Sequence, residues 1–183
     1  MHRCNGKESR MFDKFGEFDS CEELDRAAEA QRKEGDLEAL KALAVENGID
    51  PEDAEDYFDG CMYSILGEYN AMEQNAALGK LKVEKEELKV EREFQLLTEE
   101  LETACCDYPE IAIGVRRKGK RLAEYLAMVI DAGYRNAVTP PKAILDNVTA
   151  VPSQYRSQIK TGMPSKAERK EIMRKYYVGE VVE

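Results

Sequence analysis

Histidine is almost absent from this 183-residue sequence, in which His2 is the only one. Acid–base catalysis near neutral pH most often relies on histidine, which is also the commonest metal ligand. With one histidine so close to the N-terminus, we expect neither histidine-dependent catalysis nor a histidine-rich metal site. We therefore predict a protein that is not an enzyme and that uses no metal or other cofactor.

The five cysteines form no pattern typical of a metal or redox site. No pair has C-x-x-C spacing, and the adjacent Cys105 and Cys106 would point in different directions from a helix end. The start, MHRCNGKESR, has no apolar stretch that could serve as a secretion signal, so an odd cysteine count favours free thiols in a reducing compartment. No apolar run approaches the ~20 residues that a membrane-spanning helix needs. We expect a cytoplasmic protein.

Two familiar ligand-binding loops are also missing. The acidic run that starts at Asp50 has Glu55 at its sixth position, where a calcium loop requires glycine. The segment 114–120 contains glycines and lysines without the G-x-x-x-x-G-K-[ST] spacing of a phosphate loop. A helix N-terminus, which favours negative charge, explains the acidic run better.

Charge is plentiful and unevenly distributed along the chain. Residues 1–107 contain 13 Lys+Arg against 29 Asp+Glu, a net charge of −16, whereas residues 108–183 contain 14 against 8, a net charge of +6. The two values sum to the −10 of the whole chain. This layout has two interpretations, which are ordinary solubility charge and two electrostatic faces that meet different partners.

The spacing of apolar residues predicts an all-α fold, because no stretch alternates β-branched and polar residues for long. Start signals predict helices after Ser20, Asp36, Asp50 and Ser165. A short helix should follow Pro141, and one turn should form around Tyr155. We expect a helical bundle, with two subdomains as one arrangement of it. The predicted parts are a flexible leader (1–14), an acidic helical subdomain (15–107) and a basic helical subdomain (108–183).

The stretch 69–105 predicts one long central helix, since it is rich in strong helix formers. Val83, Val90 and Leu97 recur every seven residues, and Phe94 and Leu101 follow the last two by four, which is a short coiled-coil-like seam. A homodimer through the Val83–Leu101 seam is one interpretation. A long helix packed inside a bundle is the other.

A second helix is predicted over residues 110–132, with Gly133 at its end. At 100° per residue its apolar positions fall within a narrow sector, and a cluster of cations falls on the opposite side. The candidate site for nucleic acid or a partner is this cluster, which comprises Arg116, Arg117, Lys118, Lys120 and Arg121.

This basic cluster also has two interpretations. The cations could pair with the many glutamates of the preceding long helix, or they could contact phosphates. Further cations in the C-terminal third could extend a phosphate-binding surface, namely Arg135, Lys142, Arg156, Lys160, Lys166, Arg169, Lys170, Arg174 and Lys175. No residue is placed to read bases, so we predict no sequence specificity.

Three segments carry a resemblance to known proteins, namely residues 15–61 (FGEFDSCEELDRAAEAQRKEGDLEALKALAVENGIDPEDAEDYFDGC), 115–130 (VRRKGKRLAEYLAMVI) and 162–180 (GMPSKAERKEIMRKYYVGE). Together they resemble small proteins of phages and mobile elements of Gram-positive gut bacteria, some of which are similar to anti-CRISPR inhibitors of the type II RNA-guided DNA nuclease. The resemblance implies action without catalysis, by occupying effector surfaces that target DNA needs. It also implies contact with DNA for some members.

These observations lead to three hypotheses. The first is a non-enzymatic inhibitor that binds a type II CRISPR effector nuclease and blocks productive DNA engagement or cleavage in a bacterial cell. The second is an accessory or regulatory protein of a mobile element that binds double-stranded DNA. The third is an adaptor that dimerises through the Val83–Leu101 seam.

Overall fold

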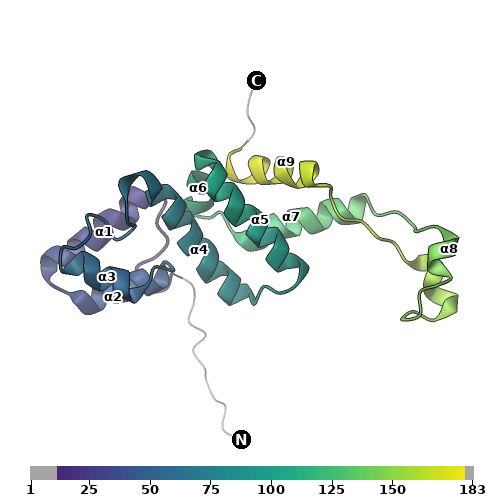
Figure 1. Cartoon of the computed structure of the whole chain (residues 1–183), viewed down its shortest axis with the longest axis horizontal. Coiled ribbons are helices and arrows are strands. Elements are labelled where there is room, and N and C mark those ends of the chain that lie inside the picture. Colours follow the sequence, from purple (N-terminus) through teal and green to yellow (C-terminus); the bar gives the residue numbers. More distant parts are fainter. Residues whose placement is uncertain (1–11, 180–183) are drawn as a thin grey trace, which may run out of the picture. The chain divides into compact units, whose positions relative to one another are not determined.

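The computed structural model describes residues 12–179 and confirms the all-α fold, because helices form most of the chain (Figure 1). The only β-pairing in this described range is an isolated antiparallel bridge between Val138 and Thr161. The chain divides into two compact units, with the first ending at Leu122 and the second beginning at Ala123. No helix within residues 12–179 combines the length and the apolar character that crossing a membrane requires.

The first unit opens with three short helices, α1 (Cys21–Glu34), α2 (Leu37–Glu46) and α3 (Pro51–Phe58), where the sequence predicts them. α2 packs against both α1 and α3 (Figure 1). Their inward residues form one apolar cluster that includes Leu24, Leu40, Leu43 and Tyr57. A 3-10 turn, η1 (Tyr69–Ala71), then leads into the next helix.

Side-chain caps explain why these helices begin where they do. Ser20 Oγ accepts from the amide of Glu23 at 3.2 Å, and Asp36 Oδ1 accepts from the amide of Ala39 at 2.8 Å. These bonds satisfy backbone donors that have no partner within the helix. In α1 the Glu23 carboxylate bonds back to the amide of Asp19 at 2.8 Å, one residue before the N-cap.

The prediction of one long central helix is wrong. Residues 69–105 fold as two helices, α4 (Met72–Leu88) and α5 (Glu93–Asp107). Lys89 adopts the left-handed conformation with φ 49°, and Arg92 also has a positive φ of 53°. The amide of Val90 returns to the carbonyl of Lys85 at 3.1 Å, which closes α4 as left-handed C-caps commonly do. α4 and α5 then pack against each other.

This break also removes the continuous Val83–Leu101 seam. Leu97 is 6% exposed and Leu101 is fully buried, so both already belong to the interior of the first unit. Phe94 lies on the outside of α5, with 40% of its surface exposed. The predicted seam therefore does not offer a partner one unbroken apolar stripe.

The helix predicted over 110–132 is also interrupted. It folds as α6 (Pro109–Arg116) and α7 (Leu122–Arg135), and α6 packs on α4 and α5. Gly133 lies inside α7 and does not end it. Because α6 packs into the first unit, the chain divides at Leu122 and not near Pro109, where the sequence suggests a boundary.

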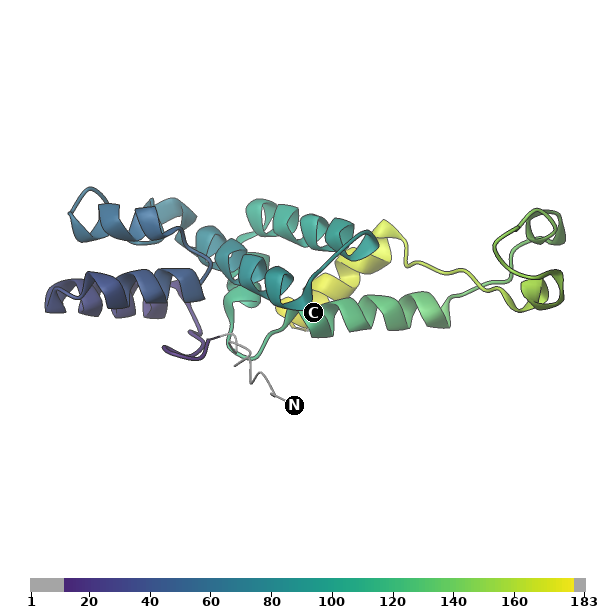
Figure 2. The same cartoon turned by 90° about the horizontal axis from the view of Figure 1, so that it is seen from below.

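The second unit contains the rest of α7, then α8 (Lys142–Leu145), the 3-10 helix η2 (Ser153–Gln158) and α9 (Lys166–Tyr177). Two extended segments run from α7 and α9 to α8 and η2 (Figure 2). We call residues 138–161 the arm. Both backbone bonds of the Val138–Thr161 bridge are made, at 2.9 and 3.0 Å, and they tie the base of the arm together. α9 begins with the predicted capping box of Ser165 and Glu168.

The predicted flexible leader, residues 1–14, falls mostly outside the described residues, as do His2 and Cys4. Its last three residues are described. Phe12 is only 8% exposed, and the amide of Lys14 donates to Glu46 Oε1 at 2.9 Å. The end of the predicted leader therefore belongs to the packed first unit.

Candidate functional site

The five predicted site residues lie at the end of α6 and in the turn that joins it to α7. α6 stops at Arg116, Arg117 leaves the helical conformation with ψ 137°, and Gly119 has a φ of 80°. A face shared by five cations requires an uninterrupted helix, so this predicted basic face does not exist. The turn 116–121 is held by a different set of residues.

Arg116 is an interior side chain with 1% of its surface exposed. Its Nη2 donates to Asn47 Oδ1 at 3.0 Å, and Asn47 is itself fully buried. The guanidinium also lies 6.0 and 5.8 Å from the ring centres of Phe12 and Phe18, within reach of a cation–π interaction. Burial lowers the pKa of Arg116 to about 10, although the charges of Glu17 and Glu84 oppose that shift. Arg116 is therefore inaccessible to a phosphate.

Arg121 is engaged by two carboxylates. Its Nη2 lies 3.1 Å from Glu17 Oε2, and its Nη1 lies 3.6 Å from Glu84 Oε1. The side chains of Glu17 and Glu84 are 6% and 3% exposed. Glu84 belongs to α4, so the sequence interpretation in which the cations pair with glutamates of the preceding helix describes Arg121 correctly.

Lys80 completes this buried cluster from α4. It is fully buried, and its Nζ donates to Glu17 Oε1 at 2.6 Å and to the carbonyl oxygen of Arg117 at 2.9 Å. Burial lowers the pKa of Lys80, although the hydrogen bond to Glu17 and the charges of Glu84 and Glu17 act to raise it. We call Glu17, Lys80, Glu84, Arg116 and Arg121 the buried charge cluster, at whose edge the Arg121 side chain stays 34% exposed.

Carboxylates also hold the backbone of the turn 116–121. The amide of Gly119 donates to Glu17 Oε2 at 3.0 Å, and the amide of Leu122 donates to Glu84 Oε2 at 2.7 Å. The amide of Lys118 donates to Asp19 Oδ1 at 3.0 Å. Glu17 and Asp19 thus join the segment before α1 to the turn, and Glu84 joins α4 to Leu122. The cluster therefore acts as a structural clamp.

The pKa values of two carboxylates in the cluster are shifted in opposite directions. Burial alone would raise the pKa of Glu17, but the Lys80 hydrogen bond, the Gly119 amide and the charges of Lys80 and Arg121 together lower it. Burial raises the pKa of Glu84, and the Leu122 amide and the nearby cations only partly oppose that rise. The difference arises because Glu17 has a lysine ammonium in direct contact.

Arg117 and Lys118 have exposed side chains, whereas Lys120 is half-buried. The turn thus presents fewer exposed cations than the sequence suggests. Sequence reasoning missed Glu17 and Lys80 as their partners. No pattern marks either residue, because charge alone does not distinguish a buried Lys80 from the exposed Lys82 two residues later.

Within the described range, one group of side chains could offer three ligand atoms to a metal. The Sγ of Cys21 and carboxylate oxygens of Glu22 and Glu73 lie within 4.8 Å of one another. Burial and the neighbouring Glu22 raise the pKa of Cys21 to about 12, which keeps the thiol protonated. Exposed acidic groups commonly lie this close together without a metal, and we assign no metal site to them.

Carboxylates dominate the outside of the first unit. Residues 12–68 contain 18 Asp+Glu against 5 Lys+Arg, a net charge of −13. Ala54 and Tyr57 turn inward from α3, and exposed acids of the helix and of its C-cap, Asp59, lie on the side opposite them. We call this set the acidic face of α3, and it comprises Glu52, Glu55, Asp56 and Asp59.

The second unit has the opposite charge. Residues 123–179 contain 9 Lys+Arg against 5 Asp+Glu, a net charge of +4. Around the arm, Tyr134 is 83% exposed and Tyr155 is 51% exposed. The side chains of Lys142 and Lys160 lie on the outside of the arm itself. Arg156 instead bonds the carbonyls of Val151 and Asp146, so it shapes the arm.

Comparison with known proteins gives no match, because no family model, no curated protein sequence and no solved structure resembles this chain significantly.

Proposed function

We propose that this protein is a non-enzymatic inhibitor of a type II CRISPR effector nuclease, which it binds so that target DNA cannot engage productively. The observation that carries the proposal is the concentration of carboxylates on the first unit. Residues 12–122 contain 29 Asp+Glu against 15 Lys+Arg, a net charge of −14, and the acidic face of α3 is exposed. The resemblance noted above supplies the class of target.

The physical argument rests on charge complementarity. An RNA-guided nuclease holds its guide and target in a positively charged channel that contacts the nucleic-acid backbone. Carboxylates on a rigid helix can occupy such a surface in place of phosphates, and long-range attraction speeds their encounter. The acidic face of α3 suits this role because Asp50 and Pro51 start the helix and buried Tyr57 fixes its orientation.

The turn 116–121 has no part in this proposal. Arg116 and Arg121 are bound within the buried charge cluster, and moving them toward DNA would strand Glu17 and Glu84 in the interior. A buried charge without its partner is costly. The structure therefore favours the acidic half of the molecule as the inhibitory surface.

A DNA cleavage assay with purified type II effectors tests the proposal. The protein is titrated against each effector, and we expect inhibition to saturate near equimolar protein, as binding without turnover requires. Glu52→Lys/Asp56→Lys/Asp59→Lys should weaken inhibition at least tenfold. The control Glu91→Lys/Glu93→Lys/Glu99→Lys changes the net charge equally at exposed positions outside α3 and should remain a full inhibitor.

Circular dichroism of both triple variants verifies that each is folded. Complete cleavage at a large molar excess of the wild-type protein, across several type II effectors, contradicts the proposal. Equal inhibition by the two triple variants contradicts the assignment to the acidic face of α3.

The second unit favours a second candidate, an accessory protein that binds double-stranded DNA directly. Its exposed lysines and tyrosines resemble surfaces that neutralise a phosphate backbone.

Fluorescence anisotropy with a labelled duplex and no nuclease should then show salt-dependent binding. Lys142→Glu/Lys160→Glu should reduce the log–log salt slope by about 2 if both lysines contact phosphates. The control Lys33→Glu/Lys82→Glu should not, and an equal effect of the two variants contradicts the assignment.

A further inference from the structure

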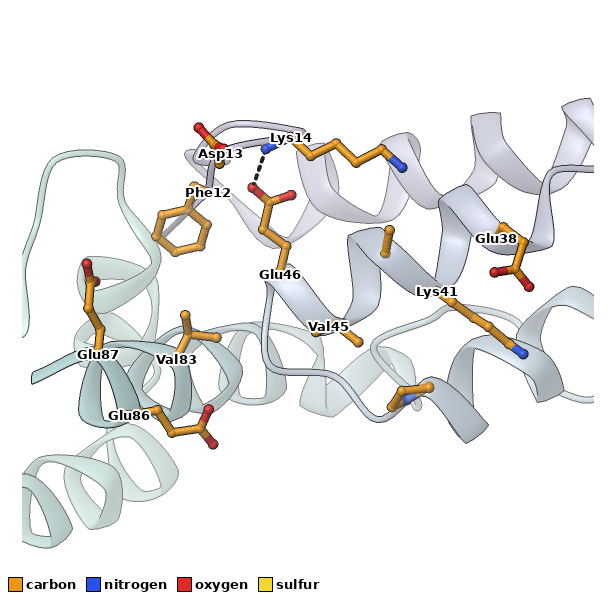
Figure 3. Close-up of a pocket in the computed structure, with 12 residues that line it drawn as sticks. Phe12, Asp13, Lys14, Glu38, Lys41, Val45, Glu46, Val83, Glu86 and Glu87 are labelled. Atoms are coloured by element: carbon orange, nitrogen blue, oxygen red, sulfur yellow. Dashed lines mark hydrogen bonds between the residues drawn. The ribbon is translucent and has the colours of Figure 1, made fainter. Parts of the chain in front are cut away.

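A groove of about 850 Å³ opens on the first unit beside α2 and the end of α4 (Figure 3). Its lining includes five apolar residues that come from four separate segments, namely Phe12, Ala42, Val45, Pro51 and Val83. Val45 is 58% exposed although it lies on a helix whose other apolar side chains are mostly buried. The groove thus presents an apolar surface that the first unit does not cover itself.

Acidic side chains surround this apolar surface. The rim carries five carboxylates against two lysines, namely Asp13, Glu38, Glu46, Glu86 and Glu87 against Lys14 and Lys41. Figure 3 shows Glu86 and Glu87 beside Val83 on α4, with Val45 and Glu46 on α2.

Some of these charges already have structural roles. Glu46 accepts the amides of Lys14 and Phe15 at 2.9 and 3.1 Å, and Lys41 forms an ion pair with Glu55. Four carboxylates remain. Among the residues that the structure describes, Asp13, Glu38, Glu86 and Glu87 have no cation within ion-pair distance.

The position of Glu86 and Glu87 strengthens the negative potential at the groove. Both lie in the last turn of α4, which ends at Leu88. Unpaired carbonyl groups give a helix C-terminus a partial negative charge, and two carboxylates there add to it. This arrangement is unfavourable in the isolated protein, and a cation from outside would relieve it.

We propose that this groove binds an amphipathic segment of a partner protein, with apolar side chains on one face and Lys or Arg beside them. The apolar side chains would cover Val45 and Val83, and the cations would reach Glu38, Glu86 and Glu87. Lysine and arginine suit this geometry because their aliphatic stems pack on apolar surface while their charged ends reach outward. Helices with such a face commonly bind grooves of this kind.

The proposal needs both halves of that chemistry. A purely cationic segment would meet mobile surface carboxylates in water and would be weakened strongly by salt. A purely apolar segment would leave the acidic rim partly dehydrated and unpaired. The inference does not rest on the proposed nuclease inhibition, and its test uses no nuclease.

The test is fluorescence anisotropy of three labelled peptides with the full-length protein. The first is a 14-residue leucine–lysine peptide with leucines at helical spacing, the second replaces its leucines with serine, and the third replaces its lysines with glutamate. We expect the first peptide to bind at least tenfold more tightly than either of the others. Its binding should persist in part at 0.5 M salt, where exposed charge pairs are screened.

Matched variants locate the site. Glu86→Lys/Glu87→Lys and, separately, Val45→Asp should each weaken binding of the leucine–lysine peptide at least tenfold. Glu91→Lys/Glu93→Lys makes the same charge change at exposed positions outside the groove lining and should keep wild-type affinity. Retained affinity in either groove variant overturns the proposal, as does an equal loss in the control.

Sedimentation velocity of the protein alone tests whether a second copy of this chain, and not a different protein, occupies the groove. We expect a monomer, whose sedimentation coefficient is the same for wild type and Val45→Asp. A concentration-dependent dimer that Val45→Asp dissociates would overturn the assignment to a different protein.

Discussion

Replacing Gly48 with alanine is expected to destabilise the first unit by about 3 kcal/mol and to lower its Tm by roughly 10 °C or more. Gly48 has a φ of 70°, and a Cβ built on it would overlap the carbonyl group of Gly79, whose carbon would lie only 2.7 Å away. The obstacle is helix backbone and not a flexible side chain. The segment after α2 can therefore approach α4 this closely only because both segments have glycine at the contact.

The control for this prediction is Gly35→Ala. Gly35 has a φ of 73°, nearly that of Gly48, but a Cβ there meets nothing within 4 Å. Its replacement should cost only the left-handed conformational penalty of about 1 to 2 kcal/mol. Urea unfolding followed by circular dichroism gives both free energies, and equal losses in the two variants contradict the close approach.

Gly79→Ala tests the same contact from α4. In an exposed helix interior this substitution stabilises by about 1 kcal/mol, because alanine is the better helix former. Here the new Cβ would overlap the carbonyl oxygen of Asn47. A net loss of stability is expected, and a gain in stability would show that the contact yields.

The sequence predicts helix starts well because a cap is a local interaction. Ser20, Asp36 and Ser165 each bond an amide three residues ahead, and Asp50 bonds one two residues ahead. A window of four residues therefore contains the whole cause. The short helix after Pro141 has no side-chain cap, but its start is also a local signal, since proline favours the start of a helix.

The break between α4 and α5 could not be predicted in this way. Nothing between Lys89 and Arg92 is glycine or proline, and both of these residues adopt positive φ in a chain of strong helix formers. Packing of α5 on α4, which buries Leu101, supplies the compensation, and that contact is non-local. Gly79, a residue type that often interrupts a helix, is instead a close contact inside α4.

The candidate site shows the same limit. The apolar sector predicted over residues 110–132 includes Ile111, Val115 and Leu122, and all three are buried although the helix breaks between the last two. It placed Arg116 on the opposite, solvent side, where the structure buries it. Asn47 bonds Arg116 from 69 residues away, and a partner at that separation leaves no mark in a periodic pattern.

Replacing Glu17 with glutamine is expected to cost about 3 to 5 kcal/mol, because it leaves the fully buried Lys80 ammonium without its carboxylate. Lys80→Met should cost less, since Glu17 would keep the Arg121 guanidinium and the Gly119 amide. The double variant Glu17→Gln/Lys80→Met should be more stable than Glu17→Gln alone. Urea unfolding of the four proteins gives the coupling energy, and additive losses contradict a direct pair.

The pH dependence of stability separates Glu17 from Glu84. The pKa of Glu17 lies below its ordinary value of 4.5 in the folded protein, so its contribution is complete above pH 4.5 and is lost as pH falls through the folded pKa. The pKa of Glu84 is raised, so protonation of Glu84 in the folded state increases stability as pH falls toward 4.5. Glu17→Gln should remove the acid loss, and Glu84→Gln should remove the rise that precedes it. An acid loss in Glu17→Gln as steep as that of wild type would mean that other carboxylates cause it and that Glu17 is not held ionised by Lys80.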